Sequence, residues 1–345
     1  MHQLAIRRLV PLVLLLLLTG CGSLRAAVGH LPGVAHPTNT PTVTPLPTAT
    51  PIPKPTSWLH GSTLLTIYGR GLGLIPILGR LGMDNSMADV AAQARPFVQG
   101  IRSQNGGKPV HVALHLIYGM ATPCTPGSNC LAYLDDAGVD IVRRYIRPAA
   151  QRGWLVILDD QLGGSSPSRE MARIIQKGYL RFDNVAVALD PEFQAVPGQD
   201  TPGIPIGTVS TIELNRAEGM LNAYARAHPL RHHKLLMVHQ FQFGQIPQRG
   251  RLRTGMPWVD VALVMDGFGD PGVKAHVYHD VLSARNAPRI HWRGIKLFYP
   301  NPYEQAGHAD GPLMTWRQVL GKAPALDVDG HYYWVSPAPQ VIIVA

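Results

Sequence analysis

The chain lacks several features that define common classes of protein. Its basic residues are scattered, with short groups only at Arg143-Arg144 and Arg231-His232-His233-Lys234, and aromatics do not alternate with them. This pattern argues against a nucleic-acid surface, and we expect no nucleic-acid partner. No glycine-rich phosphate turn with a matching acidic residue follows the first β-rich segment, so no cofactor is expected. The short-spaced zinc pairs HxH and HExxH are also missing, and the sequence assigns no metal site.

Long apolar runs are absent beyond the first 21 residues, which have the layout of an export signal. Arg7 and Arg8 precede an apolar run over Leu9–Leu18, broken only by Pro11. A run of roughly 10 residues is too short to span a bilayer as a helix. Its ending, Leu-Thr-Gly-Cys21, resembles the lipobox of bacterial lipoproteins. That resemblance implies a signal peptide over 1–20, lipidation of Cys21, and an anchor in membrane lipid on the extracytoplasmic face of the cell membrane.

Cysteine is scarce, with three residues in the whole chain. Apart from Cys21, only Cys124 and Cys130 remain, and they flank a Pro- and Gly-containing turn. In an oxidising compartment such a pair predicts a disulfide, since further metal ligands are missing nearby.

The segment between the leader and the main domain is rich in proline and threonine. Residues 37–56 contain seven Pro and seven Thr. This composition cannot bury enough apolar surface to fold and favours extended polyproline II. We therefore expect residues 21–57 to form a lipidated N-terminus and a stalk.

Charge is low at 15% of residues, and the balance is basic, +9 for the full chain. Removing 1–20 would take away Arg7 and Arg8 and no acid, which leaves +7. A basic exterior on a tethered protein suits an anionic lipid surface or a wall polymer.

Residues 58–345 alternate β-rich apolar runs with helix-like stretches, which predicts one (β/α)8 barrel. A doubly wound open sheet is the alternative. The predicted strands are Leu64–Tyr68, Val110–Tyr118, Trp154–Asp160, Val185–Asp190, Leu235–Gln240, Val259–Asp266, Gly294–Tyr299 and either Tyr332–Val335 or Val341–Val344. The predicted helices are Met87–Arg102, Ala137–Arg152, Arg169–Lys177, Thr211–Ala227, Pro271–Ala287 and Met314–Leu320.

Polar residues gather at the ends of these strands, where barrel enzymes place their sites. In the fourth run Ala186, Ala188, Asp190 and Glu192 share one face, and this small-residue face is expected to point inward. The same two-residue alternation predicts that the side chains of Asp266 and Lys296 point inward. The third run has no small-residue face, so the orientations of Asp159 and Asp160 stay open.

Inward carboxyls beside polar and aromatic groups suit cleavage of a glycosidic bond. The predicted catalytic residues are Glu192 as general acid, Asp190 or Asp266 as nucleophile or base, and Asp160 orienting substrate. The predicted substrate-binding residues are His115, Tyr118, His239, Gln240, Phe268, Lys296 and Tyr299. Phe193, Phe268, Tyr299 and Trp292 are candidate platforms for sugar rings. Asp270, which precedes Pro271, is expected to cap a helix instead.

Four segments within 185–300 carry a resemblance to a family of uncharacterised exported bacterial lipoproteins. They are Val187-Ala-Leu-Asp190-Pro-Glu192, Val238-His239-Gln240-Phe241, Met265-Asp266-Gly267-Phe268-Gly269 and Lys296-Leu-Phe-Tyr299. The arrangement is also similar to barrel glycoside hydrolases with an acid after strand four and another after strand six. It departs from families with a glutamate on strand seven, where Lys296 stands, and the DxxDxDxE signature of chitinase-type barrels is missing.

Three functions follow as hypotheses. The first is a tethered extracellular glycoside hydrolase acting on polysaccharide or cell-wall glycan. The second is a non-catalytic glycan- or wall-binding lipoprotein on the same barrel. The third is a metal-dependent hydrolase, for which His115, Asp160, Asp190, His239 and Asp266 offer suitable ligand types.

Overall fold

The computed structural model describes residues 55–125, 128–196, 198, 201–228, 230–303 and 308–345. The predicted signal peptide, Cys21 and nearly all of the predicted stalk lie outside the described residues. Among the described residues, no helix has the length and apolar character needed to cross a membrane.

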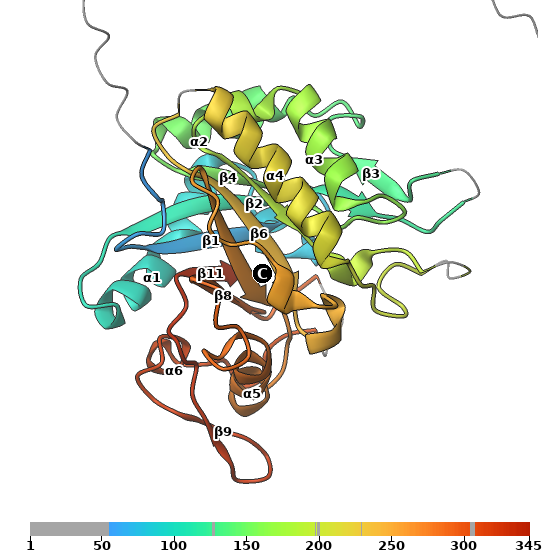
Figure 1. Ribbon diagram of the computed structural model, residues 1–345. Coiled ribbons are helices and arrows are strands. Elements are labelled where there is room, and N and C mark those ends of the chain that lie inside the picture. The colour runs from blue at the N-terminus through green and yellow to red at the C-terminus, as the bar shows by residue number, and fades with distance from the viewer. Residues whose placement is uncertain (1–54, 126–127, 197, 199–200, 229, 304–307) are drawn as a thin grey trace, which may run out of the picture. The chain divides into compact units, whose positions relative to one another are not determined.

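Eight parallel strands close into a barrel, so the fold is the predicted α/β (β/α)8 type (Figure 1). The strands are β1 Thr63–Gly69, β2 Val110–Ala121, β4 Leu155–Asp160, β5 Val185–Leu189, β6 Lys234–Gln240, β7 Val259–Met265, β8 Trp292–Leu297 and β11 Val341–Val344. β1 pairs with both β11 and β2, which closes the sheet. Of the two predicted eighth strands, Val341–Val344 is the barrel strand. β10 (Tyr332–Tyr333) instead forms a small hairpin with β9 (Ala325–Leu326).

Helices surround the barrel, and each overlaps a predicted range, although α5 ends at Leu282 and not at the predicted Ala287. They are α1 Met87–Gln104, α2 Arg147–Gln151, α3 Pro167–Gln176, α4 Thr211–Ala227, α5 Pro271–Leu282 and α6 Trp316–Val319. The helix predicted over Ala137–Arg152 is partly wrong, because a π-helical turn over Val142–Ile146 precedes a short α2. Asp270 caps α5 as predicted, accepting a hydrogen bond from the amide of Val273 at 2.9 Å. The connection from β6 to β7 contains two 3₁₀ turns, Phe243–Gln245 and Arg249–Arg251, in place of an α-helix.

The strands bury both of their faces, as the near-continuous apolar runs predict. Ala186 and Ala188 lie in the apolar cluster inside the barrel, whereas Val187 and Leu189 pack in the larger cluster under the helices. Gly294 also faces inward, where a Cβ atom would lie 2.7 Å from Cγ2 of Val264. The alternation of small and branched residues therefore reports the direction of the side chains correctly.

A short strand, β3 (Leu131–Tyr133), runs antiparallel to the end of β2 and belongs to an arm beside the barrel. The predicted disulfide between Cys124 and Cys130 is confirmed in this arm, with the two Cα atoms 4.7 Å apart. It ties the chain between β2 and β3 into a small loop at the carboxyl end of the barrel.

Candidate active site

Buried charged side chains from several strands meet inside the barrel near its carboxyl end. Asp266 lies at the centre of this group. Its Oδ2 accepts a hydrogen bond from Nδ1 of His239 at 2.9 Å and another from Nζ of Lys296 at 2.9 Å. Neither contact uses Oδ1, so that oxygen stays available on a residue that lines the adjoining cavity. The inward orientation predicted for Asp266 and Lys296 is the one the structure has.

A second group lies directly beside the first and includes His115 of β2 and Asp159 of β4. Nε2 of His115 is 3.3 Å from Oδ2 of Asp159, and Nε2 of His239 is 3.7 Å from the same oxygen. All three residues are completely or almost completely buried. His239 therefore joins the two groups, since its other ring nitrogen contacts Asp266.

Electrostatics divide these groups into different protonation states. Burial alone would raise the pKa of Asp266, but Lys296 and His239 outweigh it and hold that pKa well below its usual range. Burial would lower the pKa of His239, yet Asp159 and Asp266 raise it to about 9. For His115 burial dominates and lowers the pKa to about 4. Thus His239 and His115 carry different charges near neutral pH.

Glu192 has the opposite surroundings to Asp266. It lies in a 3₁₀ turn over Pro191–Phe193 that Asp190 caps, because the amide of Glu192 donates to Oδ1 of Asp190 at 3.1 Å. Burial, followed by the charges of Asp190 and Asp266, raises the pKa of Glu192 to about 8. Asp190 itself is 1% exposed, and burial raises its pKa to about 7. Glu192 is therefore mainly protonated near neutral pH while Asp266 is ionised.

Glu192 and Asp266 open into one cavity of about 670 Å³ at the carboxyl ends of the strands. Polar groups are few on its walls and include Gln161 and Lys296. Its aromatic lining residues are Tyr68, Phe193, Phe241, Phe268, Phe298 and His308. A mostly apolar cleft with a few convergent polar groups is the usual form of a ligand site.

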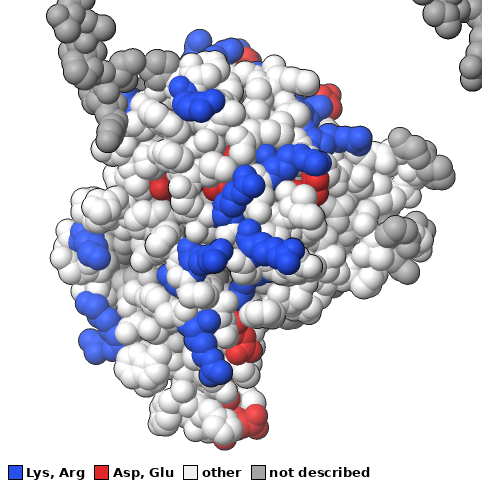
Figure 2. Space-filling model, in the orientation of Figure 1, with Lys and Arg blue, Asp and Glu red and all other residues white. Residues whose placement is uncertain are grey.

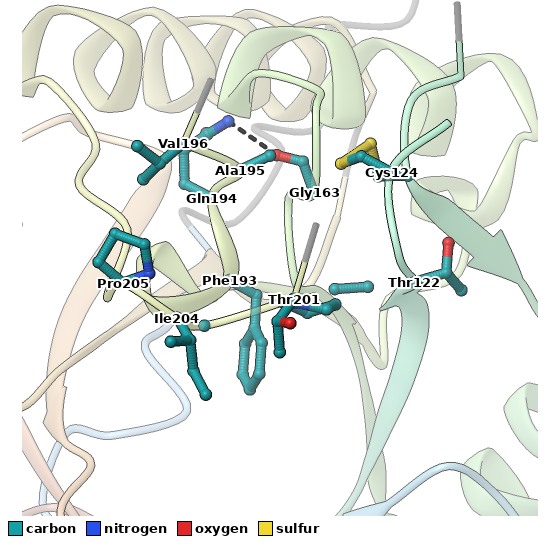
Figure 3. A pocket seen from close by; sticks show the side chains of 14 residues that line it. Thr122, Cys124, Gly163, Phe193, Gln194, Ala195, Val196, Thr201, Ile204 and Pro205 are labelled. Atoms are coloured by element: carbon teal, nitrogen blue, oxygen red, sulfur yellow. Dashed lines mark hydrogen bonds between the residues drawn. A yellow bond between two sulfur atoms is a disulfide. The ribbon is translucent and has the colours of Figure 1, made fainter. Parts of the chain in front are cut away.

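The rim of this cavity includes the loop that follows β5. Figure 3 shows Phe193 and Ile204 of this loop next to each other, while the amide of Gln194 turns away and donates to the carbonyl of Gly163 at 2.9 Å. Both Phe193 and Ile204 line the large cavity. The hollow between this loop and the disulfide arm measures only about 10 Å³, room for about one water, so substrate binding belongs to the larger cavity.

A buried ion pair fixes the loops that carry Phe268 and Phe298. Nζ of Lys274, on α5, lies 3.0 Å from Oδ1 of Asp310 and donates to the carbonyl of Lys296 at 2.8 Å. Asp310 accepts from the amide of Gly269 at 3.1 Å and from that of Phe298 at 2.9 Å. The loops after β7 and β8 are thereby held together at the cavity wall.

Replacing Asp310 with Asn is expected to lower the free energy of unfolding by about 3–5 kcal/mol, because it leaves the Lys274 ammonium buried without its counter-charge. Urea unfolding measures this loss of stability. The matched control is Asp280→Asn, at an exposed position on α5, the helix that carries Lys274. A loss no larger than that of the control would contradict the role given to the pair.

Four predicted site residues are not brought to this cavity. Asp160 lies on the outer face of β4 against Gly119, near Tyr133 and Glu170. The hydroxyl of Tyr118 donates to Asp135 at 2.9 Å under the helices. The side-chain oxygen of Gln240 accepts a hydrogen bond from Arg249, and its side-chain nitrogen donates to the carbonyls of Gln242 and Phe243. Tyr299 packs against Phe97, outside the barrel wall. These positions correct the expectation that the four face a substrate.

Other predicted residues do reach the site. His115, His239, Lys296, Asp190, Glu192, Asp266 and Phe268 lie within the buried groups or on the cavity wall. Phe193 also lines the cavity, whereas Trp292, at the start of β8, lies at the other end of the barrel.

The structure adds residues that were not predicted as site residues. Tyr68 and Phe298 line the cavity, and Nζ of Lys296 lies 4.0 Å from the centre of the Tyr68 ring. Asp159 proves to be the inward member of the Asp159-Asp160 pair. Counting by two from Lys296 reaches Phe298, so this signal was present in the sequence.

A scan against protein-family models found no match for this chain, and neither did searches of curated proteins and of solved structures. The resemblance to exported lipoproteins stays a prediction, and the functional assignment rests on the residues of the site.

Proposed function

We propose that the barrel hydrolyses glycosidic bonds, with Glu192 as general acid and Asp266 as nucleophile or general base. One observation carries this proposal: two carboxyls line the same cavity in opposite surroundings. Glu192 lies among other acids, and Asp266 lies 2.9 Å from the ammonium of Lys296. Carboxyls driven to different protonation states are what this chemistry requires.

In the proposed reaction Glu192 donates its proton to the glycosidic oxygen as the bond to the anomeric carbon breaks. Asp266 either attacks that carbon through Oδ1 or takes a proton from the attacking water. Lys296 and His239 hold Oδ2, which fixes the direction of Oδ1. The aromatic lining supplies apolar faces against which sugar rings pack.

The proposed place of action is the extracytoplasmic face of a cell membrane, with Cys21 as the lipid anchor. The leader that ends at Cys21 and the Pro- and Thr-rich segment after it support this proposal. The proposed substrate is a polysaccharide or cell-wall glycan. Figure 2 shows more Lys and Arg than Asp and Glu on the face drawn, which favours approach to an anionic polymer.

Incubating the purified protein with wall and capsular polysaccharides tests the proposal, with new reducing ends as the readout. We expect at least one of these glycans to be shortened. Tight binding of a glycan without new reducing ends would overturn the proposal in favour of a non-catalytic binding protein.

A further inference from the structure

We infer that His115, Asp159 and His239 form a binding site for one divalent transition-metal cation of the Zn²⁺ type, immediately beneath the cavity. The first argument is the position of their donor atoms. One ligand atom from each residue lies within 4.8 Å of the others. The three side chains come from β2, from its neighbour β4, and from β6, which β5 separates from β4.

The second argument is that the donor atoms of these three side chains have no hydrogen-bond partner among the described residues. Nε2 of His115, Nε2 of His239 and both carboxylate oxygens of Asp159 are buried without a hydrogen-bond partner. Such groups are costly to bury unless something compensates them. All three side chains are at most 1% exposed and aimed at one another, so a cation between them would satisfy all four of these atoms.

Distances favour a cation at that point. The His115 and His239 nitrogens lie 3.3 and 3.7 Å from Oδ2 of Asp159. A charge-assisted hydrogen bond between such groups is shorter, about 2.7–2.9 Å. Neighbouring ligands of a tetrahedral zinc ion are about 3.4 Å apart when each bond is about 2.0–2.1 Å. The observed spacing is therefore closer to that of donors around a metal than to that of a charge-assisted hydrogen bond.

The surroundings of His239 also suit a metal ligand. Its Nδ1 faces Oδ2 of Asp266 at 2.9 Å, so that nitrogen carries a proton and Nε2 is the one directed at Asp159. A carboxylate that orients a ligand histidine through its second nitrogen is a common feature of zinc sites. On His115 the hydroxyl of Thr66 occupies the corresponding place, 3.4 Å from Nδ1.

The identity of the donors gives a further reason. Two histidines and one carboxylate are donors that Zn²⁺ accepts, and the fourth position would take water. Binding of the ion would displace the proton that Nε2 of His239 carries in the metal-free protein.

Equilibrium dialysis of the full chain against Zn²⁺ or Co²⁺, followed by elemental analysis, tests the site without reference to glycan turnover. We expect about one ion per chain, ligand-field bands of four-coordinate Co²⁺, and a melting temperature that rises with Zn²⁺ and falls back with chelator. Wild-type protein that binds no ion and shows no such shift overturns the inference even if every variant misfolds.

Variants then identify the ligands. His239→Gln and Asp159→Asn should each weaken Zn²⁺ binding at least about 100-fold, and Asp266→Asn, which removes only the orienting carboxylate, about 10- to 100-fold. His276→Gln, an exposed histidine on α5, is the matched control and should bind like wild type. Unchanged binding by Asp159→Asn and His239→Gln would place the ion elsewhere and overturn the assignment.

Discussion

Glu192→Gln should slow the hydrolysis of an unactivated glycoside by about 10²- to 10⁴-fold, the usual contribution of a general acid. Gln keeps the size of the side chain but has no proton to give to the departing oxygen. Aryl glycosides with a strongly acidic leaving group need no such proton, so the variant should cleave them at a rate much closer to that of wild type. Turnover of both substrate types by the two proteins measures the effect.

The matched control for this experiment is Glu213→Gln. Glu213 lies in the first turn of α4, where it binds Arg216 and Ser168 away from the cavity. It should retain wild-type turnover on both substrates. An equal loss on activated and unactivated glycosides would show that Glu192 binds substrate and does not act as the acid.

Asp266→Asn should lower turnover by on the order of 10³-fold or more on every glycoside, whatever its leaving group. Asn can still accept hydrogen bonds from His239 and Lys296, so the change removes the charge and leaves the shape. Because the acid and the nucleophile or base act as a unit, adding Glu192→Gln to this variant should cost little more.

Asp270→Asn is the control, since Asn also caps helices well and Asp270 performs only that role at the start of α5. Circular dichroism of each variant shows whether the fold persists. Wild-type turnover by a folded Asp266→Asn protein would show that Asp266 is not the nucleophile or general base. Asp190 would then be the candidate for that role.

Strand parity explains which site residues could be predicted from the sequence. Ala186 and Ala188 marked the inner face of β5, and this gave the orientation of Asp190 correctly. β4 offers only large residues on both faces, Leu155 and Ile157 inside and Val156 and Leu158 outside, so the sequence could not choose between Asp159 and Asp160.

The same parity could have excluded three wrong predictions. Side chains an odd number of residues apart on a strand point to opposite faces. Tyr118 is three residues from the inward His115, Gln240 is one residue from His239, and Tyr299 is three residues from Lys296. A polar or aromatic residue at a strand end therefore identifies a site residue only when its side chain also points inward.

The rest of the site depends on contacts between segments far apart in the chain. Ile77 and Ile204 come from loops whose course no local pattern specifies, yet they line the same cavity as Phe298. The His115–Asp159–His239 group likewise joins three strands, and only the closed barrel brings its donor atoms together.

The pH dependence of kcat/KM on a glycan that the protein cleaves tests directly whether Glu192 is the general acid. Glu192 must be protonated to act, and burial with the nearby Asp190 and Asp266, opposed by Lys296 and His239, gives it a pKa of about 8. We predict that kcat/KM falls as the pH rises through about 8, and that Glu192→Gln lacks this decline. A wild-type profile that stays flat to pH 10, or the same decline in Glu192→Gln, would show that Glu192 is not the general acid.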